Sequence, residues 1–298
     1  MKVVPPVQID DSRLVSSNVT ETDYPEWNSA TNYAGGARVI RAAVHRIYES
    51  VASGNVNHDP QEEASSWWIE VGATNRWAMF DEAVGSETRR NAGIIVTLAP
   101  GQAVDTIGAL DTDAASMRVQ INVGGSSIYD QTQMRDDDRT TMIFADLPGS
   151  AAAEIIVTLA ASGPSVSVGI GTLIAGTSRP LGITEIGPSV GINDFSRRET
   201  DDFGVTTVVE RGWAKRMAIR SQVATQDVDP IQRDLARLRA KACLWIGEDG
   251  YDSLTIYGFF KELSIDLALA TVSYCTLTIE GLTNAPPLPE SPLRDAID

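Results

Sequence analysis

Histidine and cysteine are scarce in this chain of 298 residues, which contains two of each. Neither His45 nor His58 has a neighbouring cysteine, and the H-E-x-x-H, G-x-S-x-G, phosphate-loop and strand-linked G-x-G-x-x-G motifs are all missing. Carboxylates are abundant, so the sequence leaves open a pair of catalytic carboxylates of the kind that glycosidases use. The same abundance means that no particular pair can be singled out. The sequence therefore indicates a protein that is not an enzyme and has no catalytic residue and no cofactor.

Basic residues and long apolar runs are also few. The chain has 24 Lys and Arg against 40 Asp and Glu, which gives a net charge of −16. So acidic a surface repels phosphate backbones and disfavours nucleic-acid binding. No run approaches the length of a membrane span, and Met1–Pro6 lacks the apolar stretch of a secretory signal, so we expect synthesis in a cytoplasm.

The two cysteines, Cys243 and Cys275, lie far apart, each in an apolar, strand-like run. Because a cytoplasm is reducing, we expect two buried free thiols rather than a disulfide.

The chain is long for one core, and its apolar fraction of 43% is typical of a folded protein. Its patterns divide it into five segments: an N-terminal arm ordered only against a neighbour (1–23), a small Trp-rich β unit (24–72), a jelly-roll-like β-sandwich (73–181), a β-sandwich plus helix for assembly (182–283) and a Pro-rich, extended tail (284–298). The predicted fold class is mainly β.

The middle segment consists of short strand-like runs bounded by Gly, Pro, Asp or Ser. The expected strands are 93–98, 104–110, 117–123, 140–146, 153–159 and 166–174. The Phe80-Asp81 opening, the run at 94–98 and the run at 168–174 resemble the galactose-binding-like jelly roll, which implies a fold rather than a ligand.

Two acidic loops of this segment hold oxygen ligands of the kind that Ca²⁺ takes. They contain Asp111 and Asp113, and the run Asp136-Asp137-Asp138. Neither has the regular spacing of a calcium loop, so we interpret both as solvated loops and predict no metal.

The assembly segment alternates as strands at 205–210 and 213–223. Asp229-Pro230-Ile231-Gln232 then predicts a helix start, with Asp229 as the N-cap and Pro230 at the first helical position. The helix is expected to end near Lys241, before strands at 243–246, 253–265 and 271–282. We expect a scaffold that packs edge to edge with copies of itself.

Aromatic residues concentrate in the small unit, where strands are expected at 38–41 and 46–49. Trp67 and Trp68 are adjacent, so on a strand they face opposite sides and one is expected to be exposed. An exposed indole suits a sugar face or an interface. The spacing resembles the small chitin-binding-type carbohydrate modules, with these candidates at matching positions: Trp27, Tyr33, Tyr48, Trp67 and Trp68. The alternative interpretation is that these aromatics fill a small core.

Most of the chain resembles phage and prophage virion proteins encoded among tail genes. The resemblance is carried by segments 24–27 with 38–41, 74–81, 207–211, 257–261 and 279–282. It implies a subunit located in the tail of the virion, near the tip or baseplate, whose C-terminal part is similar to ring-forming tail-tube and distal-tail domains. Implied partners are copies of itself in a ring, other tail proteins (tube, hub, fibre) and host-surface glycan. Two alternatives stay open: a soluble carbohydrate-binding accessory protein, and a polysaccharide depolymerase.

Overall fold

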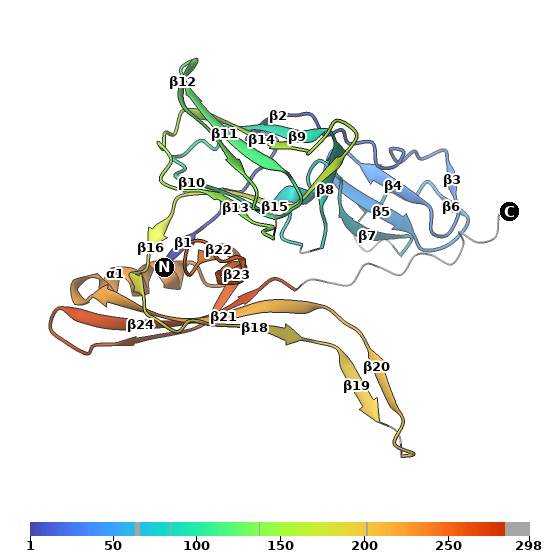
Figure 1. The fold of residues 1–298 in the computed structure, drawn as a ribbon. Helices are drawn as coiled ribbons and strands as arrows, with labels where there is room; N and C mark the ends of the chain where they lie inside the picture. Colours follow the sequence, from blue (N-terminus) through green and yellow to red (C-terminus); the bar gives the residue numbers. More distant parts are fainter. Residues whose placement is uncertain (63–65, 84, 137, 201, 284–298) are drawn as a thin grey trace.

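The computed structural model describes residues 1–62, 66–83, 85–136, 138–200 and 202–283. The predicted mainly β fold class is confirmed: the elements are 24 strands, one α-helix and three short 3-10 turns in this described part of the chain. Figure 1 shows a β-sandwich lying over a long C-terminal sheet, with a small β unit beside the sandwich. The predicted Pro-rich tail lies outside the described residues.

The sandwich has two antiparallel sheets. One follows the order β13 (Met142–Phe144), β10 (Thr106–Thr112), β15 (Ser167–Gly176) and β8 (Thr88–Asn91). The other follows β12 (Ser126–Met134), β11 (Ser116–Val123), β14 (Ala153–Ala160), β9 (Gly93–Leu98) and β2 (Leu14–Ser17). Alternate residues of β11 and β14 point inward, and the apolar ones fill a shared core that includes Ile107, Val119, Val157 and Ile170.

The small unit carries a three-stranded sheet of β4 (Arg38–Arg41), β5 (Arg46–Ser50) and β7 (Trp68–Ala73). The pair β3 (Asn32–Tyr33) and β6 (Asn55–Val56) accompanies it. Its core is a separate cluster, made of Tyr33, Val39, Tyr48 and Trp68. The unit is joined to the sandwich by a connection that contains the 3-10 turn η1 (Ala78–Phe80).

The C-terminal sheet has eight strands. Its order is β16 (Arg179–Pro180), β1 (Lys2–Val4), β22 (Cys243–Ile246), β23 (Thr255–Asp266), β24 (Val272–Gly281), β21 (Trp213–Ala224) and β17 (Ile183–Thr184). The eighth strand, β18 (Ser189–Asp194), also pairs with β21, further along its outer edge. One face of the sheet packs against helix α1 (Val228–Arg237), whose contribution to the core is Ile231 and Leu235.

The N-terminal segment differs from the expected arm. Residues 2–4 form β1, which pairs with β16 on one side and with β22 on the other. Residues 14–17 form β2 at the edge of the sandwich. The segment is therefore ordered by its own chain, because two sheets supply partners for its backbone hydrogen bonds. Val4 also joins Leu110 and Leu244 in a cluster between sandwich and C-terminal sheet.

Helix α1 begins earlier than predicted. Asp227 occupies the N-cap position in place of Asp229, because the 3-10 turn η2 (Thr225–Asp227) leads directly into the helix. Pro230 then falls in the first turn, where backbone N–H groups have no partner inside the helix and a missing one costs little. The helix ends at Arg237, four residues before the predicted end. A third 3-10 turn, η3 (Asp252–Leu254), precedes β23.

Candidate functional site

The five aromatic candidates of the small unit divide into two groups. Tyr33, Tyr48 and Trp68 are buried in the core of the unit, whereas Trp27 and Trp67 pack against it and are only partly buried. Trp68 stands edge-on to Tyr33, with ring centres 5.1 Å apart. Three of the five candidates therefore pack inside the core of the unit. Trp27 and Trp67 are the two candidates whose rings are partly accessible at its surface.

Each of these two indoles already has a neighbour on its ring. His58 stacks on Trp67 with ring centres 4.4 Å apart and planes 9° apart. The Arg41 guanidinium lies 5.0 Å from the centre of the Trp27 ring and is 3.0 Å from an Asp59 carboxylate oxygen. The result is a surface of aromatic and charged groups around the loop that holds His58 and Asp59. A flat apolar ligand face would compete with His58 or Arg41 for these rings.

A second candidate surface is a two-stranded ribbon that leaves the C-terminal sheet and projects away from the body (Figure 1). It consists of β19 (Arg197–Thr200) and β20 (Thr206–Val209), which continue the β18–β21 hairpin. Arg198 is opposite Val208 and Arg197 is opposite Val209, so each face of the ribbon carries one of the two valines. Exposed apolar side chains extend along the ribbon and its base: Ile186, Val190, Ile192, Phe195, Phe203, Val205, Val208 and Val209.

The two ends of the C-terminal sheet differ. At one end, β16 has two residues, and the second of them is Pro180, which cannot donate a hydrogen bond. At the other end, β18 pairs with β21, and no other strand among the described residues pairs with it. Val190 and Ile192 of β18 are both more than half exposed. A longer, partly apolar edge of this kind is a site where another chain can add a strand.

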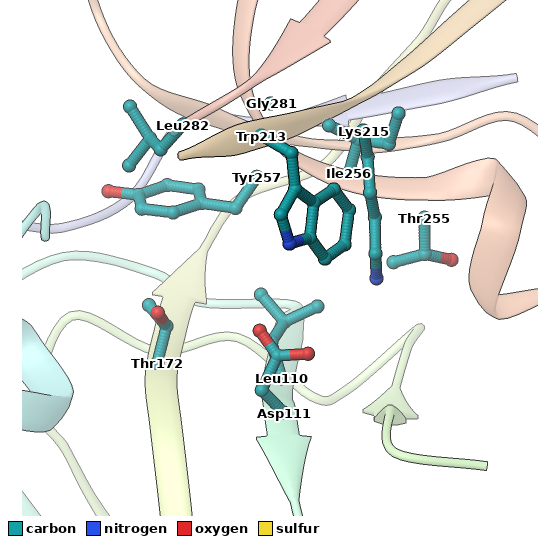
Figure 2. A pocket seen from close by; sticks show the side chains of 10 residues that line it. All are labelled: Leu110, Asp111, Thr172, Trp213, Lys215, Thr255, Ile256, Tyr257, Gly281 and Leu282. Atoms are coloured by element: carbon teal, nitrogen blue, oxygen red, sulfur yellow. The ribbon is translucent and has the colours of Figure 1, made fainter. Parts of the chain in front are cut away.

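A small pocket of about 50 Å³ lies at the base of the ribbon, between the sheet and the sandwich. Figure 2 shows Trp213 and Lys215 projecting from β21 towards Leu110 and Asp111 of the sandwich. Asp111 has a left-handed backbone with φ of 52°, which aspartate adopts more readily than most residues. Burial raises the pKa of the Tyr257 hydroxyl that lines the same pocket, so this phenol stays protonated.

Two of the acidic residues considered for calcium contact other groups of the chain. Asp113 accepts a 2.6 Å hydrogen bond from the Gly169 backbone and is 3.0 Å from Arg89. Asp136 lies 3.8 Å from Arg139, and Asp137 lies outside the described residues. In the part of the chain that the structure describes, no group of three His, Cys, Asp or Glu side chains is placed to hold a metal ion.

Sequence reasoning missed a cluster around His45. The His45 ring contacts Asp11 and Glu21, which precede it by 34 and 24 residues, and stacks on Trp77. Contacts between residues so far apart leave no local spacing that the sequence could reveal. The sequence also predicts an N-terminal arm that is ordered only against a neighbour, which gives no reason to pair its carboxylates with His45.

Comparisons with known proteins add no identification: no protein-family model matches the chain, and no curated protein matches it. Among the described residues, the helical segments are too short to cross a membrane.

Proposed function

We propose that this chain is a structural subunit of a bacteriophage tail, in the region of the tip or baseplate, which assembles with copies of itself into a ring. In the virion it would contact further tail proteins, namely tube, hub or fibre. The sandwich and the small unit would face outward from the ring, where the small unit would contact host-surface glycan.

The structural observation that supports self-assembly is the ribbon of β19 and β20, whereas the place in a phage tail rests on the sequence resemblance. A two-stranded ribbon by itself buries too little apolar surface to be stable in water. This one carries Phe195, Val208 and Val209 on its exposed surface, which is a costly arrangement for a chain that stays alone. Packing against a second copy would remove these side chains from water, which is the ordinary source of affinity at subunit interfaces.

The open edge of β18 supports the same proposal. A heterologous contact, in which one surface of a subunit meets a different surface of the next, closes into a ring when the rotation between copies allows it. The projecting ribbon, which is a two-stranded sheet of its own, and the β18 edge of the C-terminal sheet are two such different surfaces. The numerous carboxylates keep unassembled subunits soluble, because like charges repel.

The experiment is a mass measurement of the purified chain by light scattering over a range of concentrations, with negative-stain images of the same fractions. We expect a defined multimer with ring-shaped particles. A variant that joins Ser196 to Glu210 through Asn-Gly, and so removes residues 197–209, should be a folded monomer. The Arg211 backbone N–H lies 3.2 Å from Ser196 Oγ and holds the shortened ends together. A full-length chain that stays monomeric, or a shortened chain that still forms the same multimer, would contradict the proposal.

Glycan binding by the small unit is a second candidate, favoured by the partly exposed Trp67 ring. The test is a glycan screen with the full chain, Trp67→Ala and Tyr129→Ala, a partly buried aromatic of the sandwich, as the control. Binding that is lost with Trp67→Ala and kept with the control would support this candidate; an empty screen would count against it.

A further inference from the structure

The His45 side chain lies between two carboxylates of the N-terminal segment. Its Nδ1 is 2.9 Å from Glu21 Oε1, and its Nε2 is 3.0 Å from Asp11 Oδ1. An ionised carboxylate only accepts hydrogen bonds, so both ring nitrogens must donate, which requires the doubly protonated, positively charged ring. The Trp77 indole lies against the ring, with centres 4.1 Å apart and planes 22° apart, and its π-face favours a cation.

Glu21 is held firmly in this arrangement. Its side chain is 9% exposed, it accepts a 2.8 Å hydrogen bond from Thr74 Oγ1, and Arg76 lies 3.5 Å from it. The Thr74 backbone N–H also donates to the His45 carbonyl, at 3.0 Å. His45 itself forms part of the turn between β4 and β5, with a left-handed φ of 58°. Three separate segments therefore meet at one imidazole.

This meeting point joins the small unit to the rest of the protein. The core of the unit is formed by its own residues and is distinct from the core of the sandwich. Trp77 stacks on His45 and also stands edge-on to Phe80, at 5.9 Å between ring centres, and Phe80 packs against the sandwich core. The contact from unit to sandwich thus runs from His45 through Trp77 to Phe80.

A cavity of about 290 Å³ lies beside His45. The charged groups that line it are Asp10, Asp11, Arg46 and Asp81. The Arg46 guanidinium forms an ion pair with the Glu70 carboxylate, at 3.5 Å. Burial raises the pKa of Asp81, against hydrogen bonds from the Ala83 backbone and Ser86 that lower it.

We infer that His45 is a proton-dependent clasp that fixes the orientation of the small Trp-rich unit on the body of the protein. The clasp is closed while both ring nitrogens carry protons. When the ring loses one proton, a nitrogen lone pair faces a carboxylate oxygen, and the attraction becomes a repulsion. The clasp therefore opens as the pH rises, and the unit is then tethered by its two chain connections, one between β2 and β3 and the other after β7.

The test measures the distance between unit and sandwich by double electron–electron resonance, with spin labels on Val56→Cys and Ile95→Cys. Both positions are on exposed strand surfaces, and the native Cys243 and Cys275 are fully buried. We expect one narrow distance distribution at low pH that broadens as the pH is raised. ¹⁵N-histidine spectra of the same samples should show two protons on the His45 ring where the distribution is narrow and one where it is broad.

Two variants separate the clasp from a general effect of pH. His45→Asn keeps a residue that tolerates the left-handed turn but cannot carry the charge, and its distance should be broad at every pH. Asp11→Asn replaces one charged acceptor at an exposed position with a neutral amide, and its distance distribution at low pH should be broader than that of the unmodified protein. His58→Gln, the control at the other histidine, should behave as the unmodified protein. A distance that does not change with pH, or that changes equally in His45→Asn, would overturn the inference.

Discussion

Trp68 Nε1 donates a 2.8 Å hydrogen bond to the backbone carbonyl of His58. This bond ties the start of β7 to the loop that follows β6, so the buried indole closes the core of the small unit with its polar atom satisfied. The neighbouring Trp67 points to the margin of the unit, where His58 stacks on it. Two adjacent tryptophans thus have different roles, and substitutions distinguish them.

Trp68→Ala should unfold the small unit. Truncating a buried aromatic side chain costs about 3–5 kcal/mol, and this one also leaves the His58 carbonyl without its partner. Trp67→Ala should cost about 1 kcal/mol, because Trp67 is only partly buried. Guanidinium unfolding followed by tryptophan fluorescence measures both, and equal losses would contradict the assignment of Trp68 alone to the core.

Charge on the ribbon should prevent assembly while leaving the subunit folded. Val208→Glu with Val209→Glu changes two exposed residues, so the free energy of unfolding should change by no more than about 0.5 kcal/mol per site. The multimer should be lost in light scattering. The matched control is Ile95→Glu with Ile128→Glu, which adds the same charge at exposed strand positions of the sandwich and should leave the multimer intact.

Leu235→Ala should destabilise the C-terminal sheet by about 2–5 kcal/mol, because the leucine is fully buried between helix α1 and the sheet. Arg233→Ala, at an exposed position of the same helix, should be within about 0.5 kcal/mol of the unmodified protein. Thermal unfolding monitored by circular dichroism compares the two, and equal effects would show that the helix contributes no packing.

The thiols of Cys243 and Cys275 should resist modification in the folded protein. The prediction of two buried free thiols is confirmed, and burial raises the pKa of both to about 11. Since the folded state favours the protonated thiol, this contribution to stability is present below the pKa of the unfolded thiol. It declines as the pH rises towards about 11. A thiol reagent at neutral pH should label neither cysteine before unfolding and both afterwards; rapid labelling of the native chain would contradict this.

Several strands that sequence could predict have alternating burial. The expected strand at 93–98 has the same bounds as β9, and that at 153–159 differs from β14 by one residue. In these runs about every second side chain enters the core, so the alternation of apolar and polar residues can be recognised in the sequence alone. β12 was missed because it is an edge strand with exposed side chains along most of its length, which leaves no alternation to detect.

Contacts between distant segments could not be predicted. Val3 and Val4 give too short an apolar run to indicate a strand, and β1 exists because β22, about 240 residues later, pairs with it. The candidate site shows the same limit. The aromatic composition indicated a Trp-rich unit, but which tryptophan is buried depends on the bulge between Ile47 and Tyr48 that sets the register of β7.

The insertion of β1 between β16 and β22 has a consequence for biosynthesis. All strands of the sandwich have been made once the ribosome passes Gly176, the last residue of β15, so that domain can fold while translation continues. The C-terminal sheet cannot, because its first strand waits for a partner that contains Trp245 and is made near the end. Its central pairs, β23 with β24 and β24 with β21, form later still. A nascent chain that has reached Gly176 would therefore carry a finished sandwich without a finished C-terminal sheet.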